Sequence, residues 1–408
     1  MRIIRSIVIL VSSCISLCYS ILFFTLKLPT LYSYDVIVFM LEGGFGHAVT
    51  APDLVRRMYK GKKCCLIVFA ESGRSNWKSR YLWSDIDVFF LPLSIGLMLG
   101  KKKYNIVCPF WHKEHATLFF LRIVTAICRK SIVYSNFVVY ADAANYVNIK
   151  DEIKLPENFI PSGHGWPIGY FALMRDVAVD KVFLPEKIRK KIRKKIGRVC
   201  EKKLCCLYLR QKGIVKQDTD STNASRIGSD LTCYSKAIDL LNEHGYFVLL
   251  TGDVLLPYAY NGCVDAAAVG IDKDWFDLFA ATEADIFIGE AGGGSWLSGI
   301  NGIPRLLVNA FPFGYGLPGS FVFYKTLYDS QGKKIDINRC LKENLYQYTF
   351  SGFELRSNTE DELYAAVERF LLTKDELHDT HYKCPVKGLS EYSWLYQSRA
   401  RLLSLDVK

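Results

Sequence analysis

The sequence predicts an α/β protein with two doubly wound, Rossmann-like domains facing a cleft. The chain has 408 residues, of which 50% are hydrophobic and 14% aromatic, enough for two domains that each bury a core. Apolar runs of strand length alternate with segments of helical pattern, which is typical of parallel sheets covered by helices on both faces. The alternation restarts after a basic segment near residue 190. Ligands of such folds bind at the carboxyl ends of the strands.

The chain begins with an apolar segment that we expect to be a membrane anchor. Ile7 to Leu26 carries no charge, with Arg2 and Arg5 before it and Lys27 after it. That length can span a bilayer. The alternative is a signal peptide, but no clear small-residue cleavage site follows the apolar run. We therefore assign residues 1–30 to a hydrophobic anchor.

Residues 31–180 are predicted to form the first Rossmann-like domain. Its expected strands are Asp35–Leu41, Lys63–Ala70, Asp87–Leu91, Asn105–Pro109 and Ile132–Tyr140. Its expected helices are His47–Lys60 and Ala116–Cys128.

Residues 181–202 are predicted to form a basic amphipathic linker helix. Ile188, Ile192 and Ile196 recur every fourth residue within a Lys/Arg-rich run, in a chain whose formal net charge is +11. Such a helix favours an anionic membrane surface as a partner. The alternative is a solvated helix that joins the two domains. Nucleic acid is not expected, because no binding module accompanies the charge.

Residues 203–375 are predicted to form the second Rossmann-like domain, and residues 376–408 a C-terminal tail. The expected strands are Lys203–Arg210, Tyr246–Leu250, Asp285–Gly289 and Arg305–Val308. The expected helices are Ser229–His244, Trp275–Ala281, Trp296–Asn301 and Glu360–Leu372.

The 13 cysteines favour free thiols in a reducing compartment. Two adjacent pairs, Cys64-Cys65 and Cys205-Cys206, lie in strand-like runs, where neighbours face opposite ways and cannot readily share a bridge. Arg2 and Arg5 outnumber Lys27, which by the positive-inside rule would place the bulk of the chain outside. We give the cysteines more weight, and expect a membrane-associated protein with cytoplasmic catalytic domains.

A glycine run after the expected strand Asp285–Gly289 predicts a phosphate site. Gly292, Gly293 and Gly294 precede Ser295 and a short helical segment. Glycines let the backbone come close to a ligand, and the amides and dipole of a helix N-terminus attract phosphate. The alternative is a tight turn without a ligand.

Other polar residues follow the expected strands. Arg210 ends one strand and Arg226 lies in the polar loop after it, and both suit bidentate phosphate contacts. Asp253 ends the next strand, in a Gly-Asp turn that could hold a ribose. The remaining candidates for the same site are Glu290, Asn309 and Lys325.

The end of the first strand predicts a catalytic base. His47 lies near a helix start, which would keep its imidazole neutral, and Glu42 is a second candidate. Gly43, Gly44 and Gly46 would bring the backbone close to a ligand. Three D-x-D sequences occur, but none lies beside a glycine phosphate loop, so we expect neither a metal nor a cofactor.

Roughly Lys203 to Leu372 resembles a family of bacterial glycosyltransferases of the GT-B type. The residues that carry the resemblance are Arg210, Arg226, Tyr234–Ile238, Gly245-Tyr246, Gly252-Asp253, Trp275–Phe279, Phe287–Ser295 and Lys325. Gln211 stands where the family usually has aspartate, and Gly289–Gly293 reads GEAGG where the family has Gly-Thr-Ser-Ser-Gly.

The resemblance implies a metal-independent transferase that moves a sugar from a nucleotide-sugar to a membrane-linked or surface glycan. The second domain would bind the donor, and the first would bind the acceptor and supply the base. One alternative is a GT-B-like sugar-nucleotide epimerase. The other is a non-catalytic, membrane-associated sugar-nucleotide-binding protein.

Overall fold

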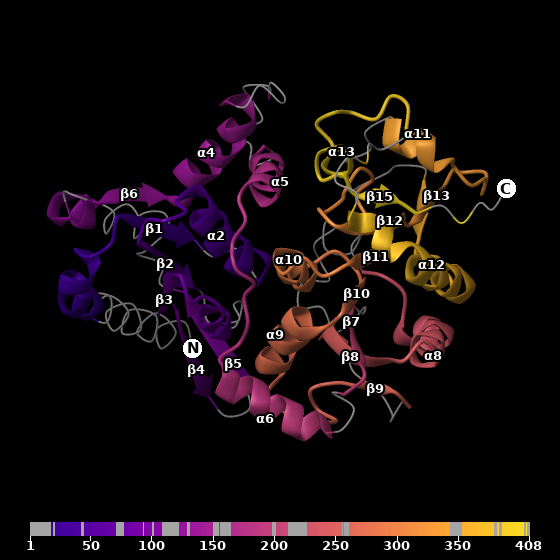
Figure 1. Ribbon diagram of the computed structural model, residues 1–408, viewed down its shortest axis with the longest axis horizontal. Helices are drawn as coiled ribbons and strands as arrows, with labels where there is room; N and C mark the ends of the chain where they lie inside the picture. The colour runs from indigo at the N-terminus through magenta and orange to yellow at the C-terminus, as the bar shows by residue number, and fades with distance from the viewer. Residues whose placement is uncertain are drawn as a thin grey trace. The chain divides into compact units, whose positions relative to one another are not determined.

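The chain divides into two compact units, Met1–Asp180 and Lys181–Lys408 (Figure 1). The structure is a computed structural model. It describes residues 18, 21–41, 45–70, 77–92, 94–99, 102–107, 122–128, 131–149, 155, 165–197, 201–210, 227–254, 256, 261–342, 353–378, 382, 386–403 and 405.

The first unit contains a parallel sheet of strand order β3-β2-β1-β6. These strands are β1 (Val36–Leu41), β2 (Cys64–Ala70), β3 (Ile86–Pro92) and β6 (Ile132–Ser135). The remaining elements are α2 (Phe45–Met58), η1 (Trp77–Leu82), β4 (Ser94–Leu99), β5 (Lys102–Val107), α4 (Asn136–Ile149), α5 (Trp166–Asp176) and helical residues 21–31 and 122–127.

The two faces of this sheet have different covers. Val38 and Met40 of β1 lie beside Ala51 and Leu54 of α2. On the other face, Phe39 packs against Phe24 from the helix of residues 21–31, with ring centroids 6.1 Å apart. Both faces of a parallel sheet must be covered, so the helix of residues 21–31 is part of the domain.

This packing corrects the predicted limit of the anchor at residue 30. Phe24 and Leu31 are buried in the core of the first unit, together with Ile37, Ile67 and Phe69. No helix within the described residues is both long and apolar enough to cross a bilayer. Residues 1–17, 19 and 20, which make up most of the predicted anchor, lie outside the described part of the chain.

Two predicted strands of the first unit differ in the structure. Asn105 belongs to β5, which pairs antiparallel with β4 in a separate hairpin. The strand predicted over Ile132–Tyr140 ends at Ser135, and α4 follows at once. Val139, Ala143 and Val147 are buried at intervals of four, so helical periodicity outweighs the local preference of valine for strands.

The second unit is built on a parallel sheet of order β15-β12-β11-β10-β7-β8-β9. Its strands are β7 (Lys203–Arg210), β8 (Tyr246–Asp253), β9 (Cys263–Val264), β10 (Ile286–Gly289), β11 (Arg305–Ala310), β12 (Ser320–Tyr324) and β15 (Arg401–Leu402). The chain leaves β7 toward β8 and later returns to pair β10 on its other side. The boundary between β7 and β10 is therefore the topological switch point.

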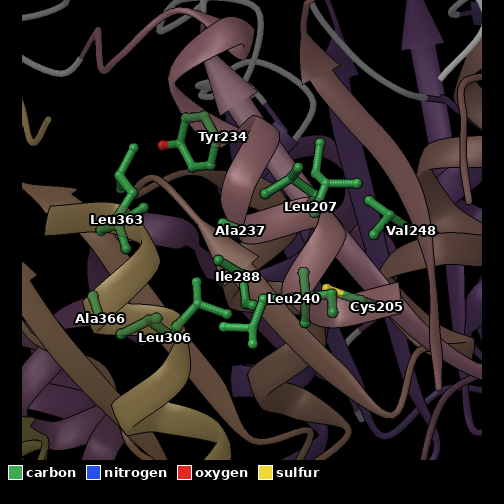
Figure 2. Packing of buried hydrophobic residues seen from close by; sticks show 14 of the residues in the cluster. Cys205, Leu207, Tyr234, Ala237, Leu240, Val248, Ile288, Leu306, Leu363 and Ala366 are labelled. Atoms are coloured by element: carbon green, nitrogen blue, oxygen red, sulfur yellow. The ribbon is translucent and has the colours of Figure 1, made fainter. Parts of the chain in front are cut away.

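Helices cover both faces of this sheet, as Figure 1 shows. One face carries α9 (Lys273–Glu283) and α10 (Gly293–Ile300), and the other carries α8 (Ser235–Glu243) and α12 (Glu360–Thr373). Figure 2 shows the core under α8 and α12, where Leu207, Ile288 and Leu306 meet Leu240 and Leu363. The other elements are η4 (Leu231–Tyr234), β13 (Thr326–Tyr328), α11 (Ile337–Lys342), β14 (Glu354–Arg356), η5 (Lys374–His378) and α13 (Trp394–Gln397).

The predicted linker helix and tail are parts of the second unit. The basic helix is α6 (Glu186–Ile196), whose Ile192 and Ile196 are buried. Arg189 and Arg193 both donate to Glu283 of α9, whose side chain is 3% exposed. At the other end of the chain, β15 joins the sheet edge beside β12.

Candidate functional site

The polar residues predicted for the second domain gather at the carboxyl edge of its sheet. Arg210 ends β7 and pairs in register with Asp253 at the end of β8. Glu290 follows β10, Asn309 lies in β11, and Lys325 follows β12. Parallel strands end on the same edge, so these residues from five strands come together. Arg226 lies outside the described residues, as does Gln211.

The glycine loop lies against Tyr208 of β7. Gly289 has a φ of 152°, and a Cβ there would lie 2.1 Å from the Tyr208 carbonyl oxygen. A Cβ on Gly292 would lie 2.6 Å from Tyr208 Oη, and one on Gly294 would lie 3.0 Å from the ring. Gly289 is therefore required by the close approach of two backbones, and Gly292 and Gly294 by the close approach of the loop to the Tyr208 ring.

α10 begins at Gly293, three residues before the predicted start at Trp296. Ser295 Oγ accepts from Gly292 N at 3.2 Å and donates to Gly292 O at 2.7 Å. This hydroxyl closes the first turn of the helix, which differs from its predicted role in binding a ligand. The first amides of a helix have no partner within it, so those of Gly293 and Gly294 carry the positive end of the dipole.

Glu290 and Lys325 lie beneath this edge and contact backbone groups of their own domain. They are 1% and 5% exposed. Arg210 N donates to Glu290 Oε2 at 2.7 Å, and Lys325 Nζ donates to Ile227 O. Arg210 and Ile227 flank residues 211–226, so the two side chains hold both ends of that segment. We predicted that both side chains contact a ligand directly. Their burial and their backbone partners indicate instead that they support the loop ends around the site.

Burial controls the charge of both groups. It raises the pKa of Glu290 to about 8, against the opposing effects of the Arg210 amide and the charge of Lys325. It lowers the pKa of Lys325 to about 8, against the effect of Glu290. Each group is thus drawn toward its neutral form by loss of water.

Asn309 is also part of this buried support. Its φ of 50° is one that asparagine tolerates better than most residues. Its Nδ2 donates to Tyr234 Oη at 3.1 Å, and its Oδ1 accepts from Asn358 N at 2.6 Å. Ser229 Oγ donates to Asn358 O at 2.6 Å. Tyr208, Ser229 and Asn358 were not among the predicted site residues, because their roles depend on contacts between distant segments.

Arg210 has an unused hydrogen-bond donor at this edge. Its Nε is buried and has no hydrogen-bond partner in the described part of the chain. Nearby, Asp253 is partly exposed, and burial raises the pKa of Asp277 on α9 to about 6 despite its ion pair with Lys273. A buried arginine donor at a strand end, beside a helix N-terminus, is suited to an anionic ligand.

In the first unit, His47 lies in the first turn of α2, at the end of β1. Its Nδ1 is 3.3 Å from Tyr140 Oη, and Tyr140 stacks on Trp166 with ring centroids 4.8 Å apart. Burial lowers the pKa of His47 below 6.5, so the imidazole is neutral at physiological pH. Gly46 lies inside α2 rather than in a loop, and Glu42, Gly43 and Gly44 lie outside the described residues.

A buried network that no sequence pattern predicted lies at the other end of α2. Asp53 accepts hydrogen bonds from Arg56 Nε at 2.7 Å, Arg57 Nε at 2.6 Å and Tyr170 Oη at 2.6 Å. Arg57 also donates to Val177 O. The network ties α5 and the end of the first unit to α2.

Thiols and metal ligands add no further centre in the described residues. No group of three or more His, Cys, Asp or Glu there is placed to hold a metal. The described cysteines are free, and burial raises the pKa of Cys64 to about 11 and of Cys206 to about 12.

No family model and no curated protein matches the sequence. Among solved structures, the chain is similar to a family 9 glycosyl transferase from Veillonella parvula (TM-score 0.45, 13% identity, 83% of this chain and 98% of that one). It is also similar to the ADP-heptose lipopolysaccharide heptosyltransferase II of E. coli (TM-score 0.42, 11% identity, 83% of this chain and 99% of that one). A third similar structure is the UDP-GlcNAc 2-epimerase of Methanocaldococcus jannaschii (TM-score 0.34, 9% identity, 82% of this chain and 99% of that one). At these scores and identities we draw neither an activity nor a ligand from the similarity.

Proposed function

We propose that this protein is a glycosyltransferase of the GT-B type that moves a sugar from a nucleotide-sugar to a membrane-linked or surface glycan, without a metal. One observation carries the proposal. Arg210, Asp253 and the glycine loop at the start of α10 converge at the carboxyl edge of a parallel sheet, at its topological switch point. This is the position at which doubly wound domains bind nucleotides.

The chemistry of sugar transfer fits the charges at this edge. The acceptor hydroxyl oxygen bonds to the anomeric carbon, the bond from that carbon to the phosphate oxygen breaks, and a nucleoside diphosphate leaves. Negative charge grows on the diphosphate as it departs. Arg210 and the amides of Gly293 and Gly294 would offset that charge without reorganising.

His47 is our proposed base, which takes the proton of the acceptor hydroxyl. A base must be unprotonated at the working pH, and burial keeps this imidazole neutral. The ring centroids of Tyr140 and Trp166 lie 6.4 Å and 6.1 Å from that of the imidazole. Glu42 is the alternative base.

We also propose that the protein contacts an anionic bilayer. Ile21, Leu22 and Leu26 are 50%, 55% and 68% exposed on the outer face of the helix of residues 21–31. A surface helix normally has a polar outer face, and this one continues an uncharged run that starts at Ile7. The exposed lysines of α6 would add attraction to anionic headgroups.

Calorimetric titration with ADP, GDP, UDP and CDP tests the donor site, and glycan transfer from the matching nucleotide-sugar in EDTA tests the reaction. We expect one diphosphate to bind and transfer to persist in EDTA. Sugar-nucleotide turnover without an acceptor would indicate the epimerase, and binding without turnover a binding protein. If none of the four diphosphates binds, the proposal fails.

A further inference from the structure

The loop between β10 and α10 has no free hydroxyl to offer a phosphate. Ala291, Gly292, Gly293 and Gly294 have no polar side chain, and Ser295 Oγ is committed to Gly292. Phosphate sites at helix N-termini combine backbone amides with side-chain donors. Any hydroxyl that contacts a phosphate at this loop would therefore come from another element.

Tyr208 of β7 brings a hydroxyl to this place. A Cβ on Gly252 would lie 3.1 Å from Tyr208 Cε2, so a glycine of β8 and glycines of the loop all lie close to the ring. The end of the ring is nearest to Gly292, the residue that caps α10. Side chains two apart on a strand share a face, so Tyr208 lies on the same face as Arg210.

The hydroxyl of Tyr208 is available as a donor. The side chain is partly exposed, and its Oη has no hydrogen bond to any described residue. The titratable groups that act on it are Arg210, Asp253, Asp277 and Glu290. Burial, above all, raises its pKa, although Arg210 opposes that effect, so the phenol keeps its proton at neutral pH.

We infer that Tyr208 Oη donates a hydrogen bond to the diphosphate of a nucleoside-diphosphate ligand at the first turn of α10. The loop has glycines where it faces Tyr208, because side chains at Gly292 and Gly294 would collide with the ring. This inference rests on the proposed function, since it assigns a contact within the same donor site.

A purely structural role for the ring makes a different prediction. Tyr208 stacks on Phe287 of β10 with centroids 6.2 Å apart, and that packing needs no hydroxyl. Tyr208→Phe keeps the ring and removes only the oxygen. Tyr246→Phe is the matched control, because Tyr246 is a buried tyrosine at the opposite end of the same sheet, at the start of β8.

The experiment is calorimetric titration of wild type and both variants with ADP, GDP, UDP, CDP and the corresponding monophosphates. We expect Tyr208→Phe to weaken the best diphosphate about 10- to 100-fold, as for lost hydrogen bonds to charged groups, with an unchanged melting temperature. Tyr246→Phe should stay within about twofold of wild type, because its effect on a distant site is negligible.

Unchanged diphosphate affinity in folded Tyr208→Phe would overturn the inference and leave the proposed function standing. Failure of wild type to bind any diphosphate would instead remove the proposed function. Gly292→Ala supplies a second measurement, because its Cβ would meet the ring. Gly292→Ala should lower the melting temperature less in a Tyr208→Leu background than in wild type. An equal decrease in both backgrounds would contradict the role given to Gly292.

Discussion

Glu290 shows how loss of water at a single residue can link stability to pH. Its carboxyl is buried and accepts hydrogen bonds from Arg210 N and Tyr234 Oη. Its pKa is about 8 in the folded protein and near 4.5 in the unfolded chain. Between these values the folded state holds a proton that the unfolded state has lost, so stability falls as pH rises.

We therefore expect the free energy of unfolding of wild type to fall with pH relative to that of Glu290→Gln. The limiting slope for one proton is about 1.4 kcal/mol per pH unit. Urea unfolding at pH 5 and pH 7.5 measures the difference. Lys325, whose pKa is lowered to about 8, acts above this range and favours folding as pH rises further. A constant difference between the two proteins would show that Glu290 is ionised when folded.

Arg210→Ala should weaken nucleoside-diphosphate binding by about 2–5 kcal/mol, the usual cost of losing a desolvated charge contact. The fold should survive, because Arg210 N and not its guanidinium bonds to Glu290. Calorimetry and a thermal melt measure the two effects. Wild-type affinity in a folded variant would refute the donor-site assignment.

His47→Ala should reduce turnover about 10²- to 10⁴-fold, as expected for loss of a general base, with little effect on nucleotide affinity. Steady-state kinetics beside calorimetry separate these quantities. Tyr140→Phe is the companion variant, since it removes the partner hydroxyl 3.3 Å from Nδ1 and leaves the base. Equal loss of nucleotide affinity would mean that His47 belongs to the donor site, and full activity would move the base to Glu42.

At the scale of elements, α6 divides its basic residues between two tasks. Arg189 and Arg193 neutralise the buried Glu283, so they are structural. Lys187, Lys191 and Lys194 are exposed, and no ion pair holds them in the described residues. The helix is therefore both a covering element of its domain and a carrier of surface charge.

Lys187→Gln with Lys191→Gln should weaken binding to anionic vesicles by about 2 kcal/mol at low salt, or about 1 kcal/mol per lysine. The control is Lys333→Gln with Lys334→Gln, which removes the same charge from two exposed lysines near β13. Vesicle co-sedimentation measures both. If the two pairs weaken binding equally, net charge rather than α6 is responsible.

At the scale of the whole molecule, the second unit begins earlier than its first strand. Val182 N donates to Asn301 Oδ1 at 2.9 Å, and Asn301 Nδ2 donates to Val182 O at 2.8 Å. Asn301 caps the end of α10, whose start carries the glycine loop. The segment before α6 is thereby joined to the helix that supports the candidate site.

A fragment of residues 181–408 should consequently melt at a higher temperature than one of residues 203–408. The shorter fragment lacks α6, so α9 loses both the arginine partners of Glu283 and the apolar cover that Ile192 and Ile196 supply. Thermal circular dichroism of the two fragments measures the effect. Equal melting temperatures would mean that α6 is not needed by the second unit.

Local patterns account for most of the elements and for the strand ends that carry polar residues. The apolar runs of β1, β2, β7 and β10 are long and bounded by turn residues, so the sequence predicts them within a few positions. The position of Arg210 and Asp253 at strand ends follows from the same runs. The start of α10 was predicted at Trp296 and lies at Gly293, because Ser295 is suited to cap a helix and here lies inside its first turn.

The α/β class, the two parallel sheets and the edge at which Arg210, Asp253 and the glycine loop meet can all be predicted from the sequence. These depend on periodicity and chain order, which are local properties. Three features required the folded structure: residues 21–31 cover a sheet, Glu290 and Lys325 lie beneath the site, and Tyr208 occupies the space left by the glycines. Each of these depends on which distant surfaces exclude water from one another, and burial of that kind has no signature in the neighbouring residues.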